Sequence, residues 1–158
     1  MSNCIIKSVL ELDGDKAPLS KLDISGATLL DDSEAFMHID TSFMSHLNLS
    51  NSPLRSFCFL PHMKVLEHLD LSSTMMGDDA IEEIVCIGAN LRYLDLSKNK
   101  ISSVGVGILA GHVPNLEILS LSETSVDDVA ISYISLMPSL KEIDLSKTNI
   151  KGMNFTLQ

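Results

Sequence analysis

A short pattern of apolar residues recurs along most of this chain and limits what it can fold into. The pattern places leucines at its first, fourth and sixth positions and a small polar residue at its ninth, as from Leu91 to Asn99. Six copies align on their second apolar residue, and the aligned residues are Leu22, Leu47, Leu69, Leu94, Leu119 and Ile143. The intervals between them are 25, 22, 25, 25 and 24 residues. A unit of that size cannot bury its own apolar face, so consecutive units must stack.

Each copy predicts a strand followed by a returning segment. Side chains alternate across a strand, so the second and third leucines of a copy point inward to the core. The returns of the third, fourth and fifth copies carry apolar residues three to four positions apart, which predicts short helices. Polar side chains just before these returns are expected to cap the helices, and the candidates are Asp78 or Asp79, Ser102 or Ser103, and Asp127 or Asp128.

Three departures from the regular copy carry expectations of their own. The glycines at 105, 107 and 111 predict a fourth return that frays. The second return is shorter and predicts an extended or single-turn connection. The ninth-position residues are expected to satisfy backbone groups where the strand ends, and they are Ser52, Thr74, Asn99, Thr124 and Thr148.

Two stretches, Leu66 to Ile81 and Leu116 to Ile131, resemble the leucine-rich repeats of the ribonuclease-inhibitor-like group. The resemblance covers about residues 19–152. It implies an α/β fold, a leucine-rich-repeat solenoid with a curved parallel sheet on the concave face and short helices on the convex face. Such repeats occur in intracellular proteins, including the substrate-binding arms of ubiquitin ligases and innate-immunity proteins.

The repeats divide the chain into two parts. Residues 19–158 are interpreted as a leucine-rich-repeat domain of about six repeats, the last of them incomplete. Residues 1–18 are either an N-terminal cap or a decayed repeat, since an open end needs cover for its apolar side. Because the sixth copy stops before a complete return, we interpret the chain as a segment or short form of a longer protein.

Charge and composition exclude several classes of partner. The chain has 11 basic and 21 acidic residues, a formal net charge of -10, which disfavours nucleic acid as a partner. No apolar run approaches the roughly 18 residues of a membrane span, and no signal peptide is predicted. The cysteines, Cys4, Cys58 and Cys86, form no metal or disulfide pattern and are expected to be reduced and mostly buried. A cytoplasmic, intracellular protein is expected.

The residues between the core positions are expected to face the concave side in three columns. The candidate partner-binding residues in these columns are His46, His68, Asp70, Tyr93, Asp95, Ile118, Ser120, Glu142 and Asp144. Neighbouring parallel strands lie about 4.8 Å apart, so Asp70 and Asp95 would be near neighbours of like charge with no evident structural need. One hypothesis is an acidic strip for a protein partner with a basic surface, with Tyr93 and Ile118 as apolar contacts. The other is that these acids are solvated strand filling without a function. The third column, which includes Ser97, is predicted to be open as well.

These columns favour a non-catalytic protein-protein interaction module without cofactors. The resemblance also allows a substrate-recognition segment of a larger ubiquitin-ligase or immune-receptor protein. A different class, a metal-dependent or Ser/His hydrolase, would use the histidines at 46 and 68 with Asp70 or a neighbouring serine. An open sheet offers no oxyanion hole and no exclusion of water, so an enzyme is not expected.

Overall fold

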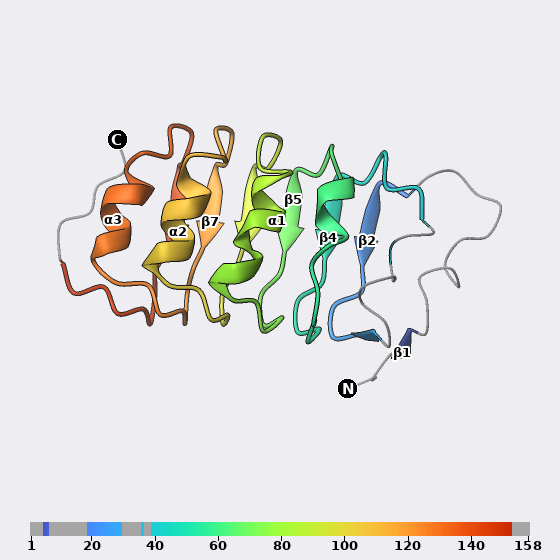
Figure 1. Ribbon diagram of the computed structural model, residues 1–158, viewed down its shortest axis with the longest axis horizontal. Coiled ribbons are helices and arrows are strands. Elements are labelled where there is room, and N and C mark those ends of the chain that lie inside the picture. The colour runs from blue at the N-terminus through green and yellow to red at the C-terminus, as the bar shows by residue number, and fades with distance from the viewer. Residues whose placement is uncertain (1–4, 7–18, 30–35, 37–38, 153–158) are drawn as a thin grey trace.

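The computed structural model describes residues 5–6, 19–29, 36 and 39–152, and it shows a stack of strand-and-return units (Figure 1). Six of the described strands form one parallel sheet in chain order: β2 (Lys21–Asp23), β4 (His46–Asn48), β5 (His68–Asp70), β6 (Tyr93–Asp95), β7 (Ile118–Ser120) and β8 (Glu142–Asp144). Their register pairs the six aligned residues of the sequence repeat with one another, from Leu22 at one end to Ile143 at the other. The predicted repeats and their register are confirmed.

A second, two-stranded parallel sheet lies near the N-terminus. It pairs β1 (Ile5–Ile6) with β3 (Thr28–Leu29). The rest of the segment 1–18 lies outside the described residues, as does most of the return of the first repeat. The choice between a cap and a decayed repeat therefore stays a prediction.

The returns carry short helices on the side opposite the sheet. They are the 3₁₀ helices η2 (Leu60–His62) and η3 (Asp78–Ala80) and the α-helices α1 (Ile81–Val85), α2 (Ser103–Ala110) and α3 (Val129–Ile134). The three α-helices stand side by side in front of the sheet in Figure 1. The predicted helices of the third to fifth returns are confirmed, and so is the single turn of the second return.

Side chains at the helix starts behave only partly as predicted. The Ser102 hydroxyl accepts a hydrogen bond from the amide of Val104 at 3.2 Å, and the Asp127 carboxylate accepts one from the amide of Val129 at 3.1 Å. The prediction of a cap at Asp78 or Asp79 is wrong, because neither η3 nor α1 has a side-chain hydrogen bond at its start. The Asp78 carboxylate instead accepts hydrogen bonds from the amide and the hydroxyl of Ser102. That side chain therefore joins two repeats rather than starting its own helix.

The glycines of α2 allow close packing between helices. A Cβ added at Gly105 would lie within 2.3 Å of an Asp78 carboxylate oxygen, and one at Gly107 would lie 3.0 Å from the ring of Tyr133. Helix α2 is the longest described helix, with eight residues. The prediction that the fourth return frays considered only the low helix propensity of glycine. The close packing that these glycines allow against the neighbouring repeats outweighs that cost.

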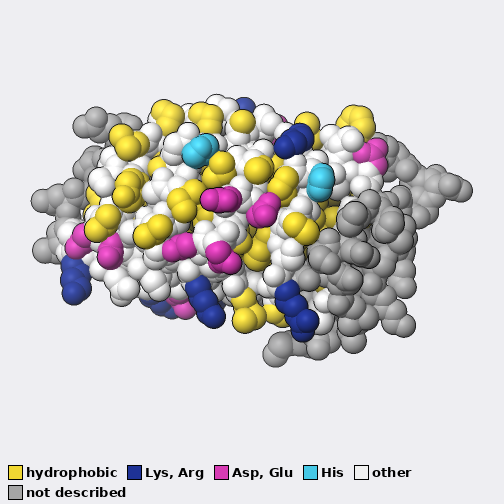
Figure 2. Space-filling view, in the orientation of Figure 1, with side chains coloured by type: hydrophobic (Ala, Val, Ile, Leu, Met, Phe, Trp, Pro, Cys, Tyr) yellow, Lys and Arg dark blue, Asp and Glu magenta, His cyan; other side chains and the backbone are white. Residues whose placement is uncertain are grey.

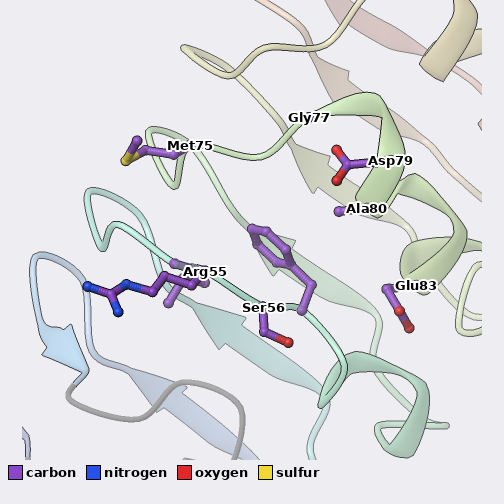
Figure 3. Close-up of a pocket in the computed structure, with 9 residues that line it drawn as sticks. Arg55, Ser56, Met75, Gly77, Asp79, Ala80 and Glu83 are labelled. Carbon is purple, nitrogen blue, oxygen red and sulfur yellow. The ribbon is translucent and has the colours of Figure 1, made fainter.

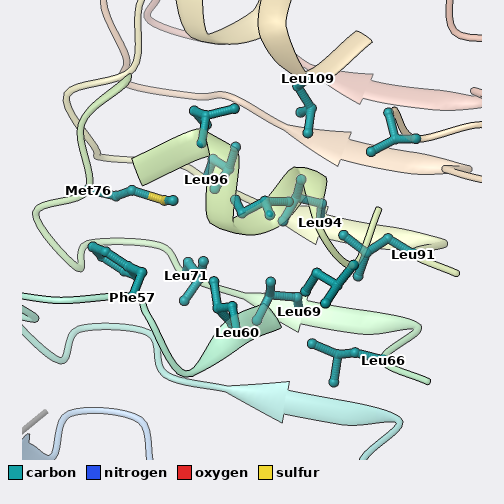
Figure 4. Packing of buried hydrophobic residues seen from close by; sticks show 14 of the residues in the cluster. Phe57, Leu60, Leu66, Leu69, Leu71, Met76, Leu91, Leu94, Leu96 and Leu109 are labelled. Carbon is teal, nitrogen blue, oxygen red and sulfur yellow. The ribbon is translucent and has the colours of Figure 1, made fainter. Parts of the chain in front are cut away.

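The core is a continuous column of apolar side chains between the sheet and the helices. Leu69, Leu94 and Leu119 are fully buried, and so are the third leucines of the same repeats (Figure 4). Each buried leucine stabilises the fold by roughly 1.5 to 3 kcal/mol. Cys58 and Cys86 form no disulfide with a described residue and are exposed, so the prediction that the cysteines are mostly buried is wrong for these two.

The ninth-position residues have the predicted structural role. The Asn99 side-chain oxygen accepts from the amides of Thr74 and Met76 at 3.1 and 3.0 Å. Its amide nitrogen donates to the carbonyls of Leu71 and Leu96 at 2.7 and 3.1 Å. One side chain thus satisfies backbone groups of two successive repeats.

No helix in the described part of the chain is both long and apolar enough to cross a membrane.

Replacing Leu94 by Ala should lower the free energy of unfolding by about 2 to 5 kcal/mol, because it leaves a cavity where three neighbouring repeats meet. Urea denaturation followed by circular dichroism measures this. The matched control is Val104→Ala, since that side chain is 66% exposed and its change should cost less than about 0.5 kcal/mol. Equal losses in the two variants would contradict a core held by the repeat leucines.

Candidate partner-binding face of the sheet

The first and third residues of each strand point away from the helices, because the middle residue is turned into the core. We call the surface that these side chains form on β2 and β4–β8 the strand face. The structure places all nine predicted residues on it, in two columns. One column runs through His46, His68, Tyr93, Ile118 and Glu142, and the other through Asp70, Asp95, Ser120 and Asp144.

Three aromatic rings stack along the first column. The ring centroids of His46 and His68 are 5.2 Å apart with planes inclined by 17°. Those of His68 and Tyr93 are 3.9 Å apart with planes inclined by 3°. Because the ring faces cover one another, the ring edges are left for solvent or a partner. The column ends in Lys21 on one side and in Ile118 and Glu142 on the other.

The hydrogen bonds around His46 define its tautomer. The Ser45 hydroxyl donates to the carbonyl of Ser20 at 3.0 Å, and its oxygen lies 2.9 Å from Nδ1 of His46. A hydroxyl carries one hydrogen, so the ring nitrogen must be the donor in the second bond. In the neutral imidazole this leaves Nε2 as a bare acceptor.

Burial shifts the titration of the other two rings. Burial, and then the neighbouring His46, lower the pKa of His68, although the Asp70 carboxylate opposes this. Burial, and then the negative charges of Asp95 and Asp70, raise the pKa of Tyr93. Both rings are therefore held in their neutral forms near pH 7.

The acidic column has a structural role that sequence reasoning missed. One carboxylate oxygen of Asp70 accepts from the amide of Ser72 at 2.9 Å, and one of Asp95 accepts from the amide of Ser97 at 2.8 Å. The same turn is made at the other acidic or amide positions of the column, by Asp23, Asn48 and Asp144. Accepting the amide two residues on lowers the pKa of Asp23 and of Asp144. The expectation that the fold has no evident need for these acids is thus corrected.

The serines of the third column are less accessible than predicted. Ser50 and Ser97 are 8% and 6% exposed, so both are buried. The Ser97 hydroxyl shares a hydrogen bond of 2.6 Å with the hydroxyl of Ser120, which replaces the acid in its repeat. The prediction that Ser97 is open to a partner is wrong, because the chain turns inward there.

Charge on the strand face is not neutralised within the described residues. The ion pairs among the described residues lie outside the strand face. They join Glu117 to Arg92 and Lys141, at 2.8 and 2.6 Å, and Glu123 to Lys147 at 3.0 Å. None of them involves Asp70 or Asp95. Each of these two carboxylates has one oxygen bound to its turn. The Asp95 carboxylate also takes part in a side-chain hydrogen bond with Tyr93.

Metal-ligating side chains do not gather in threes in the described part of the chain. The two histidines of the strand face are neighbours, but no third histidine, cysteine or acid of the described residues completes a site with them. The structure therefore gives no geometric basis for placing a cation there.

A hollow that sequence reasoning missed lies between the second and third repeats. It measures about 260 Å³, and the residues lining it are Leu54, Arg55, Ser56, Phe57, Met75, Gly77, Asp79, Ala80 and Glu83 (Figure 3). Acidic side chains gather over the middle of the helix side in Figure 2. Asp79, which lines the hollow, and Glu82 are exposed. The shortened 22-residue interval was the sequence signal for this irregular junction.

Comparisons with known proteins point to one family. Models of the leucine-rich repeat match residues 62–85 and 89–150. A Toll-like receptor 2 type-2 from Gallus gallus is 35% identical over 92 residues, which are 56% of this chain and 12% of the receptor. An F-box/LRR-repeat protein 12 from Arabidopsis thaliana is 30% identical over 116 residues, which are 71% of this chain and 29% of that protein. The chain thus spans less than a third of the length of either relative.

A solved structure supports the fold. An internalin C2 from Listeria monocytogenes superposes with a TM-score of 0.63 at 20% sequence identity. The match covers 86% of this chain and 65% of the internalin. At this identity the likeness concerns the architecture alone.

Removing the carboxylate of Asp95 should separate its structural role from its charge. Asp95→Ala removes the acceptor for the Ser97 amide and should lower the free energy of unfolding by about 1 kcal/mol. Asp95→Asn keeps an acceptor oxygen without the charge and should cost less than the alanine variant. Urea denaturation of both variants measures the difference. Equal stability of the two variants would contradict the role of the turn.

The stability of the chain should fall as the pH drops below about 6.5, the ordinary pKa of histidine. The pKa of His68 is lower in the folded chain than in the unfolded chain, so the unfolded chain takes up the proton first. The contribution of the neutral ring is present above the unfolded pKa and is lost as the pH falls towards the folded one. Denaturation curves between about pH 7.5 and 5.5 should show a flatter dependence for His68→Gln than for wild type. His112→Gln, a change at an exposed histidine, should leave the dependence unaltered.

Proposed function

Since this chain belongs to the leucine-rich repeat family, whose domains are generally protein-interaction modules, we propose that it binds a protein partner without catalysis and does so through the strand face. The observation that carries the proposal is the pair of acidic side chains, Asp70 and Asp95, on two adjacent central strands. Neither is engaged in an ion pair with another described residue. We propose a partner with a basic surface.

Hydrogen-bonding capacity supports the same partner chemistry. The second carboxylate oxygens of Asp70 and Asp95 are acceptors, and so is Nε2 of neutral His46. Lysine and arginine side chains and backbone amides are the complementary donors. Half-buried Tyr93 and Ile118 add apolar contact area beside these acceptors, as the centre of an interface requires.

The relatives favour a second proposal about context. One is a Toll-like receptor and another an F-box/LRR-repeat protein, and the chain spans a minor part of each. The chain would then be the recognition segment of a larger immune-receptor or ubiquitin-ligase protein. We also propose that nucleic acid is not a partner, on the ground of the acidic charge. A cytoplasmic location without a membrane partner is proposed because the cysteines show no disulfide pattern and no apolar run of the sequence is long enough to span a membrane.

The geometry around His46 disfavours the hydrolase alternative. A serine nucleophile must give its proton to the imidazole. Here the Ser45 hydroxyl gives its proton to a backbone carbonyl, and the imidazole donates to the serine. That arrangement positions the ring and leaves the serine without a base.

Replacing the two central carboxylates of the strand face, Asp70→Asn with Asp95→Asn, should abolish capture of the protein partner from cell extract, because their charge is removed while the turns are kept. Immobilised wild-type chain and variant are compared by mass spectrometry of the captured proteins. The matched control, Glu82→Gln with Glu83→Gln, removes the same charge from the helix side and should capture the partner as wild type does. If the control loses the partner and the strand-face variant keeps it, the partner binds the helix side.

A further inference from the structure

We propose that the strand face is an acid-sensitive binding site, which holds a basic protein segment while His46 and His68 are neutral and releases it when these two rings take up protons. The inference rests on the proposed function, because it concerns the regulation of the same surface. It is carried by the ring stack and by the hydrogen bonds that orient it.

The first step is a change in hydrogen-bonding character. In the neutral form, His46 donates through Nδ1 to Ser45 and offers Nε2 as an acceptor. Protonation adds a hydrogen at Nε2, so the outward edge of the ring becomes a positively charged donor. A partner group that donated to this edge then meets a second donor and loses its hydrogen bond.

The second step is repulsion within the stack. The His46 and His68 ring centroids are 5.2 Å apart, so two imidazolium charges there would repel each other strongly. The charged or titratable groups on the strands around them are Lys21, Asp23, Asp70, Tyr93 and Asp95. Lys21 opposes protonation of His68 and Asp70 favours it. Double protonation therefore strains the stack that arranges the binding face.

The third step is cancellation of the attractive charge. Carboxylates in general stay ionised through the pH range in which histidines titrate. The central strip has two negative charges, from Asp70 and Asp95, and two protonated rings would add two positive charges on β4 and β5. Protonation of both rings would therefore cancel the two negative charges that attract a basic segment near pH 7.5.

The titration of the free chain tests the switch without a partner. Histidine ring signals in proton–carbon NMR spectra of the whole chain are followed between about pH 8 and 4.5. We expect the titration of His68 to depend on the neighbouring ring of His46. Since His46 lowers the pKa of His68, the variant His46→Gln should raise that pKa. An unchanged His68 titration in the variant would overturn the switch and leave the proposed binding function standing.

A binding assay with a defined probe tests the consequence. The probe is an unlabelled oligo-arginine peptide with an acetylated N-terminus and an amidated C-terminus, whose own charge does not change between about pH 7.5 and 5.5, and its binding is followed by isothermal titration calorimetry. Its affinity for wild type should fall about tenfold or more between these two pH values, while His46→Gln with His68→Gln should show the same affinity at both. The matched control is His62→Gln with His112→Gln, two exposed histidines outside the strand face, and it should keep the wild-type dependence. Circular dichroism at both pH values verifies that each variant is folded.

Each other outcome has one meaning. Equal wild-type affinity at the two pH values would overturn the switch alone. A pH dependence that persists in the double variant of the strand face would assign it to other groups and would also overturn the switch. Absence of binding near pH 7.5 would overturn the proposed function and the switch with it. The same holds if added peptide does not shift the backbone amide NMR signals of Asp70 and Asp95.

Discussion

Polar side chains that bind backbone groups of two successive repeats join each repeat to the next and help to hold the solenoid together. Asn99 binds backbone groups on both sides of the junction between the third and fourth repeats, with four hydrogen bonds between 2.7 and 3.1 Å. Asp78 binds the start of the following return in the same way. Because buried backbone groups must be paired, a repeat removed from its neighbour would lose polar contacts as well as apolar cover. Folding and stacking are therefore one event.

The sequence repeat predicts those features of the fold that follow from the alternation of side chains along a strand. The register of the six aligned residues, the buried leucines and the membership of the strand-face columns all follow from a period of two within each copy. The role of a polar side chain did not follow, because a single aspartate can cap a helix, bind a neighbouring repeat or end a strand. Asp78 shows this in its bond to Ser102, and Asp95 in its bond to Ser97. The prediction that α2 frays was wrong for a similar reason. Helix propensity describes an isolated helix, whereas Gly105 of α2 packs closely against Asp78 of the preceding repeat.

The junction of the second and third repeats shows how the solenoid absorbs an irregular copy. At the later junctions the amides of Lys100, Ser125 and Asn149 donate to the seventh residue after the aligned position of the preceding repeat. Here the amide of Leu54 donates forward to the carbonyl of Thr74, and Met75 takes a positive φ of 67°. Left-handed backbone recurs once in the turn of each repeat from the second to the sixth, at Asn51, Ser73, Lys98, Glu123 and Lys147. Met75 is an additional left-handed residue next to the shortened return. The hollow of Figure 3 opens at this place.

The two interpretations of the acidic column, silent filling and binding strip, are compatible in the structure. The turn uses one oxygen of each carboxylate, and Asp70 and Asp95 keep accepting capacity that the turn does not use. At the neighbouring positions the column has Asn48 and Ser120, which are neutral. Asparagine keeps the turn, since Asn48 accepts from the amide of Ser50 at 2.9 Å. The turn thus requires an acceptor but no charge, and the charge of the two central repeats is the part that the fold does not explain.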